Sequence, residues 1–129
     1  MVDTKVIQVG DRQVLLMDFS HLRDAALATA TDDAIATVRS VTAPHSVLAL
    51  LDLTGTPANR TLLTSLRKLS ENNGPFIRAM AFTGLSPIPR SLLKALLRFS
   101  GRTNHEVFLT RNEALDWLTG QPMKAALPT

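Results

Sequence analysis

One segment sets the architecture of this chain: Val47-Leu48-Ala49-Leu50-Leu51-Asp52-Leu53-Thr54-Gly55-Thr56-Pro57. Its apolar part is continuous rather than alternating, which is typical of a strand that is covered on both faces of a parallel sheet. The glycine marks a turn, and Thr56 before Pro57 predicts the N-cap and first turn of a helix that runs to about Asn73. A buried strand that leads through a tight turn into a helix indicates an α/β fold.

The same two patterns repeat on both sides of this segment. Short apolar runs between turn residues predict further strands, and apolar residues at helical spacing predict further helices. Gly10-Asp11-Arg12 predicts a hairpin turn, and Thr31-Asp32-Asp33 is a candidate break in the first helix. The predicted strands span 6–9, 14–19, 46–53, 77–83 and 106–109, and the predicted helices span 23–41, 56–73, 86–101 and 110–120.

The predicted order is therefore β-β-α-β-α-β-α-β-α in a single domain of residues 1–120, followed by a flexible tail at 121–129. Strands that alternate with helices need crossover connections, so we expect a mostly parallel sheet with the N-terminal antiparallel hairpin toward one edge. The runs at 47–51 and 79–82 are expected side by side near its centre. The last helix starts at a capping box formed by Thr110 and Glu113 and carries Trp117, which we expect to be largely buried.

The composition is that of an ordinary soluble domain, with 45% hydrophobic and 19% charged residues. No apolar run approaches the roughly 20 residues that a membrane span needs, so no transmembrane segment is predicted, and no apolar leader follows Met1. Cysteine is absent, which excludes disulfides and thiolate chemistry. The expected location is the cytoplasm.

Four parts of the chain, at 14–20, 50–55, 79–85 and 107–118, resemble strands and the closing helix of a known family. The closing part, Glu113-Ala114-Leu115-Asp116-Trp117-Leu118, is the most distinctive. The chain resembles the SpoIIAA-like proteins, which are small bacterial domains related to the STAS fold of anti-sigma factor antagonists. The resemblance implies a STAS-type α/β fold and, more distantly, the topology of the lipid-binding CRAL-TRIO domain.

The chain departs from STAS antagonists at the place where those proteins carry an Asp-Ser-Ser-Gly segment with a phosphorylated serine. Here the segment reads Asp52-Leu53-Thr54-Gly55-Thr56, and the serine pair is missing. This difference argues against the same phosphorylation switch. Thr56 and Thr61 are the candidate hydroxyls for modification near that place.

Positive charge is concentrated between residues 60 and 102, where eight cations stand against a single acid, Glu71, although the whole chain carries a net charge of only +3. Four of these cations are spaced by four residues and form one stripe of a predicted helix, which we call the basic stripe. The stripe predicts contact with an acidic protein partner or an anionic membrane surface. The competing interpretation is an ordinary solvated helix face. The basic stripe consists of Arg90, Lys94, Arg98 and Arg102.

A second candidate site lies where strands lead into helices, because ligands of open α/β sheets bind outside the carboxyl ends of the strands and helix N-termini attract anions. The competing interpretation is a set of ordinary turn and cap residues. The anion-binding candidates are Thr54, Thr56, Arg60 and Ser86.

No catalytic constellation, metal-ligand spacing or cofactor motif occurs in the sequence, so no cofactor is predicted. The histidines, His21, His45 and His105, are expected in loops. Asp18 and Asp52 end two strands and either face one crevice as a carboxylate pair or cap local turns. The aromatic residues fit buried positions, which argues against nucleic-acid binding.

These observations predict a non-enzymatic regulatory or protein-interaction module that uses its basic helix surface, with homo-oligomers possible. The alternative, implied by the CRAL-TRIO resemblance, is a binder of a small amphipathic or lipid-like ligand.

Overall fold

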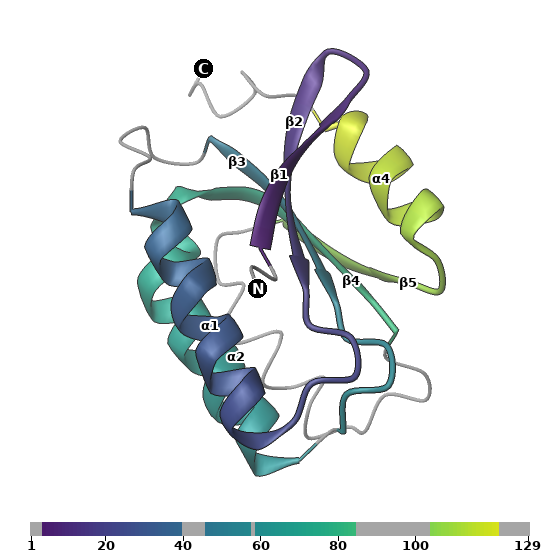
Figure 1. Cartoon of the computed structure of the whole chain (residues 1–129). Coiled ribbons are helices and arrows are strands. Elements are labelled where there is room, and N and C mark those ends of the chain that lie inside the picture. Colours follow the sequence, from purple (N-terminus) through teal and green to yellow (C-terminus); the bar gives the residue numbers. More distant parts are fainter. Residues whose placement is uncertain (1–3, 40–45, 58, 85–103, 122–129) are drawn as a thin grey trace.

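The computed structural model describes residues 4–39, 46–57, 59–84 and 104–121, and its centre is a five-stranded sheet in the order β1-β2-β3-β4-β5 (Figure 1). β1 pairs antiparallel with β2, and all later neighbours are parallel. The predicted α/β class is therefore confirmed, as are the hairpin at one edge and the adjacent central strands. The strands are β1 (Thr4–Val9), β2 (Arg12–Asp18), β3 (Val47–Asp52), β4 (Ile77–Thr83) and β5 (Asn104–Phe108).

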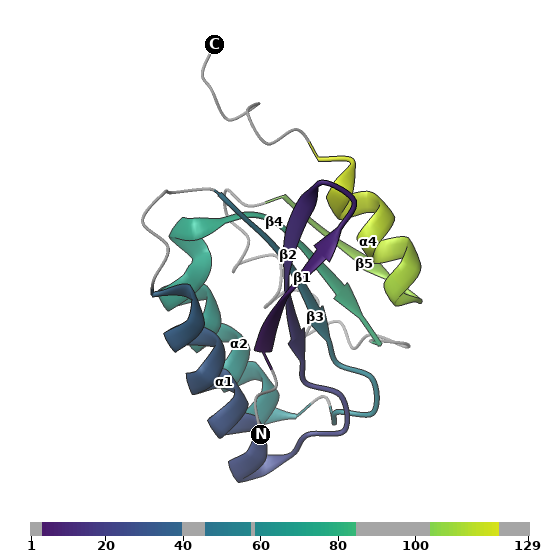
Figure 2. The same cartoon turned by 45° about the horizontal axis from the view of Figure 1, so that its top comes forward.

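Helices cover both faces of this sheet. α1 (Asp24–Val38) and α2 (Arg60–Asn73) lie side by side on one face, and α4 (Arg111–Thr119) lies on the other (Figures 1 and 2). α1 and α2 run in the same direction because each connects two parallel strands. A short 3-10 helix, Gly74–Phe76, leads from α2 into β4. Within the described ranges, no helix has the length and apolar character needed to cross a membrane.

The two helix layers explain the continuous apolar run of β3. Ala49 and Leu51 pack in the core beneath α1 and α2, while Leu48 and Leu50 pack in the core beneath α4. All four side chains are at most 2% exposed. A strand buried on both faces has no polar alternation, which is why its sequence identifies it clearly.

The start of α2 differs from the sequence prediction. The helix begins at Arg60, and its cap is Asn59, whose Oδ1 accepts a hydrogen bond of 3.1 Å from the Leu62 amide. Thr56 was predicted as this cap, but its hydroxyl instead donates to the carbonyl of Phe19 in the preceding loop. A tertiary contact therefore replaced the local one at Thr56.

Two further expectations about helices were wrong. α1 is not broken at Thr31-Asp32-Asp33 but continues to Val38, and the buried Thr31 hydroxyl donates to the Leu27 carbonyl one turn earlier, at 2.8 Å. Trp117 is partly rather than largely buried: it packs at the margin of the α4 core, with its ring centroid 5.7 Å from that of Phe108.

The predicted capping box of α4 is confirmed, and Gly120 caps its C-terminus. The helix predicted at 86–101 lies outside the described residues, as does most of the predicted tail.

Candidate functional site

The polar residues at the carboxyl ends of the strands form a row on the α4 face of the sheet. Asp18 of β2 stands directly opposite Asp52 of β3, which in turn stands opposite Thr83 of β4. The two carboxylates thus lie on adjacent strands at the same level, as one of the two sequence interpretations predicted.

Each carboxylate also closes a local turn, as the other interpretation predicted. Oδ1 of Asp18 accepts hydrogen bonds from the Ser20 amide at 3.2 Å and the Ser20 hydroxyl at 2.5 Å. Oδ1 of Asp52 accepts from the Thr54 amide at 3.0 Å and the Thr54 hydroxyl at 2.6 Å. The two strands therefore end in the same Asp-x-Ser/Thr turn.

Arg111 joins the two carboxylates. Its Nε and Nη2 each lie 2.7 Å from Oδ2 of Asp52, and its Nη2 lies 3.3 Å from Oδ1 of Asp18. Arg111 is the first residue of α4, which the Thr110–Glu113 capping box holds in helical conformation. A cation in the first turn opposes the helix dipole, and the two carboxylates offset that cost. We call these three residues the Arg111 clamp.

Burial and charge set the acidity of the clamp. The Asp52 side chain is only 8% exposed, while those of Asp18 and Arg111 are 44% and 41% exposed. Burial acts to raise the pKa of both carboxyls, but hydrogen bonds from Ser20 or Thr54 and the nearby Arg111 guanidinium outweigh it, so each pKa lies below its ordinary value. The same contacts raise the pKa of Arg111 against the opposing effect of burial. The carboxylates are therefore held in their charged form.

The loops beside the clamp approach each other closely. Gly55 has a φ of +73°, and a Cβ at this position would lie 2.2 Å from Nδ1 of His21. Gly84 has a φ of +83°, and a Cβ there would lie 2.3 Å from the backbone nitrogen of Thr54. The positive φ favours glycine at both positions, and at Gly84 the Thr54 backbone also leaves no space for a side chain.

Thr56, in the loop after β3, forms hydrogen bonds with the loop after β2. Its hydroxyl donates to the Phe19 carbonyl and accepts from the Leu22 amide at 3.3 Å, and the residue is 8% exposed. Thr54 is exposed, but its hydroxyl donates to Asp52. Both predicted anion-binding threonines thus already have acceptors within the protein.

The remaining predicted site residues do not join this group. Arg60 is exposed in the first turn of α2, beside a shallow depression of about 340 Å³ between α1 and α2 that Thr61, Thr64 and Lys68 also line. Ser86 and the basic stripe lie outside the described residues. Anion binding and partner binding at these positions stay predictions.

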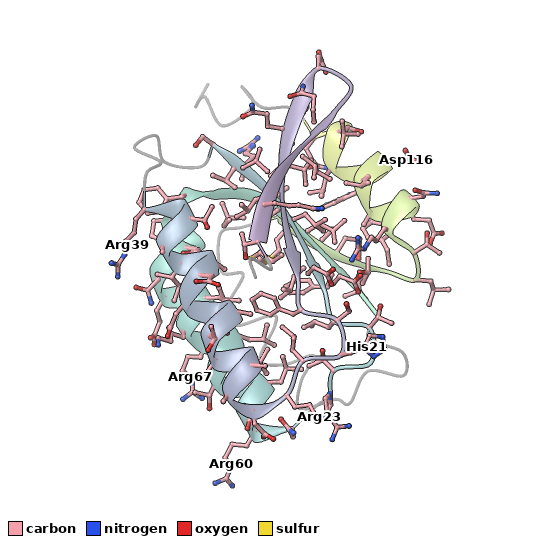
Figure 3. All side chains as sticks on the ribbon, in the orientation of Figure 1. His21, Arg23, Arg39, Arg60, Arg67 and Asp116 are labelled. Atoms are coloured by element: carbon pink, nitrogen blue, oxygen red, sulfur yellow. The ribbon has the colours of Figure 1, made fainter. Side chains whose placement is uncertain are left out.

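Of the predicted loop histidines, His21 lies exposed in the loop after β2 (Figure 3). His105 belongs to β5, so that prediction was wrong for His105. His45 is outside the described residues. Across the part of the chain that the structure describes, no cluster of three or more His, Cys, Asp or Glu side chains is placed to hold a metal ion.

The sequence interpretation missed Arg111. Two signals were present: the repeated Asp-x-Ser/Thr at Asp18 and Asp52, and an arginine at the first position after a helix cap, where a cation is unfavourable.

Comparison with known proteins supports the fold. No family model and no curated protein sequence matches the chain. A solved structure from Shewanella loihica PV-4 does, with a TM-score of 0.68 and 18% sequence identity over 89% of this chain and 91% of that one. That structure is described as an uncharacterized protein from the DUF3478 family with a SpoIIAA-like fold. This chain therefore has a SpoIIAA-like fold, as the sequence resemblance predicted.

Proposed function

We propose that this protein is a non-enzymatic interaction module whose basic stripe binds an acidic protein partner in the cytoplasm. The observation that carries the proposal is the Arg111 clamp. The carboxylates that would be the natural acid–base groups of a strand-end site are ion-paired, hydrogen-bonded and held charged, so they fasten α4 to the sheet instead. Surface charge then becomes the main feature for recognition.

The sheet topology supports the same conclusion. Ligand crevices of open α/β sheets form where the strand order reverses and adjacent loops diverge. In the described sheet the order runs β1 to β5 without reversal, and the loops after β2, β3 and β4 are drawn together at Gly55 and Gly84. At these two glycines the described loops therefore touch one another.

A protein partner fits better than a membrane surface. A helix that binds lipid by its apolar face needs that face free. On the helix predicted at 86–101, however, Leu92, Leu93, Leu96 and Leu97 have the spacing of residues that pack on a sheet. Trp117, which could have served as an interfacial anchor, packs against Phe108 instead.

The proposal is tested with the quadruple variant Arg90→Gln, Lys94→Gln, Arg98→Gln and Arg102→Gln. Its charge-matched control carries Lys5→Gln, Arg23→Gln, Arg39→Gln and Lys124→Gln, which removes the same charge elsewhere. The probe is a synthetic peptide rich in Asp and Glu, followed by fluorescence anisotropy at low and high salt.

The parent and the control should bind the peptide with an affinity that falls steeply with salt, and the quadruple variant should lose binding while keeping its circular dichroism spectrum. Equal binding by the quadruple variant and the control would contradict the proposal. Stripe-dependent binding to phosphatidylserine vesicles, with none to the peptide, would identify a membrane surface instead.

A further inference from the structure

The outer surfaces of α1 and α2 have opposite characters. The exposed or half-exposed outer side of α1 carries small side chains and acids, while the exposed outer side of α2 carries mainly long cationic side chains. The α1 surface consists of Ala25, Thr29, Asp32, Asp33 and Ala36, and the α2 surface consists of Arg60, Thr64, Arg67, Lys68 and Glu71.

One ion pair fixes the relative height of the two helices. Nζ of Lys68 lies 2.8 Å from Oδ1 of Asp32, so these residues are level. Asp24 precedes Asp32 by eight residues, and Arg60 precedes Lys68 by eight. At a rise of about 1.5 Å per residue, Asp24 and Arg60 are therefore also level, about 12 Å nearer the helix N-termini.

The charges alternate along each helix in a complementary way. From the N-terminal end, α1 presents Asp24, then Asp32 and Asp33, and then Arg39 after its last turn. α2 presents Arg60 at the level of Asp24 and presents Arg67 and Lys68 at the level of Asp32 and Asp33. Glu71 lies about 6 Å nearer the helix N-termini than Arg39. Figure 3 shows Arg39 and Arg67 extending from the helix layer away from the sheet, whereas Arg23 lies toward the His21 side.

We propose that this face binds a second copy of the same chain. A two-fold axis parallel to the helices places α1 of each protomer over α2 of the other, with both pairs parallel. Acids then meet bases at the levels of Asp24 and of Asp32. The small α1 side chains also leave room for the long α2 side chains of the partner.

The alternative two-fold axis, perpendicular to the helices in the plane of the interface, is disfavoured by charge when it passes at the level of the Lys68–Asp32 pair. It would place α1 over α1 and bring the acids Asp32 and Asp33 against their own copies, and it would likewise oppose Arg67 and Lys68. The charge pattern therefore favours the axis parallel to the helices, and this axis pairs Asp33 of each protomer with Arg67 of the other.

The size of the face sets the expected strength. Two helices of this length, about 22 Å long and about 9 Å apart, give a footprint on the order of 400 Å² per protomer. Stable interfaces bury about 800 Å² per partner. The dimer is thus weak, and its affinity depends on salt because exposed charges carry it.

Analytical ultracentrifugation tests the dimer between about 10 µM and about 1 mM protein. Raising NaCl from about 50 mM to about 0.5 M should weaken the dissociation constant at least about tenfold. Asp33→Lys and Arg67→Glu should each weaken dimerisation by a similar factor. In each variant homodimer, residues 33 and 67 carry like charges in both of the two symmetry-related pairs. Neither side chain has a hydrogen bond or ion pair of its own in the described structure, so both variants should remain folded.

Mixing these two variants gives the decisive result. In the mixed dimer, Lys at 33 faces Glu at 67, and the remaining Asp33 and Arg67 face each other, so native mass spectrometry should detect the heterodimer in preference to either homodimer. Two matched controls should dimerise as the parent does. One is Asp116→Lys on α4, which lies on the opposite side of the sheet (Figure 3), and the other is Lys5→Glu.

Three outcomes would overturn the proposal: a monomer at every concentration in low salt, a dimer that both single variants form as well as the parent, or a mixture that gives no preferred heterodimer.

Discussion

Arg111 connects residues that lie far apart in the sequence through one planar group. Its two donors on Asp52 and its contact with Asp18 use the fork geometry that distinguishes a guanidinium from an ammonium. Because Asp52 is nearly buried while Arg111 is not, most of the energetic consequence of losing Arg111 comes from leaving Asp52 charged without a partner.

We therefore expect Arg111→Met to lower the free energy of unfolding by about 1–3 kcal/mol, a range reduced for the solvent exposure of Arg111 and Asp18. Arg111→Lys should recover only part of this loss, since a lysine does not make the forked contact. Urea unfolding at pH 7 measures both. The matched change Arg67→Met, at an exposed position on α2, should stay within about 0.5 kcal/mol. Equal effects at positions 111 and 67 would show that the clamp contributes nothing.

The two glycines beside the clamp differ in what surrounds them. A Cβ at Gly84 meets backbone atoms of Thr54, which have no room to move, whereas a Cβ at Gly55 meets the imidazole of His21, which rotates away. Gly84→Ala should thus destabilise by about 2–3 kcal/mol and Gly55→Ala by about 1 kcal/mol. Denaturant midpoints of the two variants test this order, and the reverse order would contradict it.

At the level of single elements, the start of α2 shows that two nearby polar residues have different structural roles. Its cap is Asn59, whereas Thr56 ties the loop after β3 to the loop after β2. Asn59→Ala should lower stability by about 1 kcal/mol and fray the start of α2. Thr56→Val removes two hydrogen bonds at a buried site and should cost about 1–3 kcal/mol.

Hydrogen exchange separates the two effects. The loss at Asn59 should appear in the first-turn amides of α2, including that of Leu62. The loss at Thr56 should appear at the Leu22 amide in the preceding loop. If Thr56→Val exposed the α2 amides instead, Thr56 would be acting as the helix cap after all.

The contrast between local and long-range contacts explains which elements could be predicted from the sequence. β3 and β4 were located from the sequence because burial on both faces leaves a continuous apolar run, and α4 because Thr110 and Glu113 are close in sequence. The start of α2 was misplaced because Thr56 satisfies a carbonyl 37 residues away. Local patterns contain no information about such a partner.

In the candidate site, too, the local features were predictable from the sequence and the long-range contact was not. Asp18 and Asp52 were identified because each ends a predicted strand, and parallel strands bring those ends together. Arg111 was missed because its role depends on α4 crossing to the opposite face of the sheet, and no spacing in the sequence encodes that placement.

At the scale of the whole molecule, the clamp makes stability depend on pH. The folded-state pKa values of Asp18 and Asp52 lie below their ordinary values, so their contribution is fully present above the unfolded pKa of about 4 and is lost as the pH falls through the folded values. Stability should therefore decline as the pH falls below about 5.

The double variant Asp18→Asn and Asp52→Asn should be less stable than the parent at pH 7 and should show a shallower decline between about pH 5 and pH 3. Trp117, the single tryptophan of the chain, lies on α4 and packs against Phe108 of β5, so its fluorescence follows the docking of α4. The matched change Asp116→Asn on the exposed side of α4 should keep the parent's profile. A double variant with an unchanged slope would show that other groups control the acid response.

The clamp also imposes an order on the making of this protein. The ribosome synthesises Asp18 and Asp52 well before Arg111. A partly synthesised chain therefore holds these two carboxylates without their counter-ion. β2 and β3 can pair during that interval only with mutual repulsion at their ends. The arrival of α4 brings Arg111 to both carboxylates, removes this repulsion and lays the helix against the second face of the sheet.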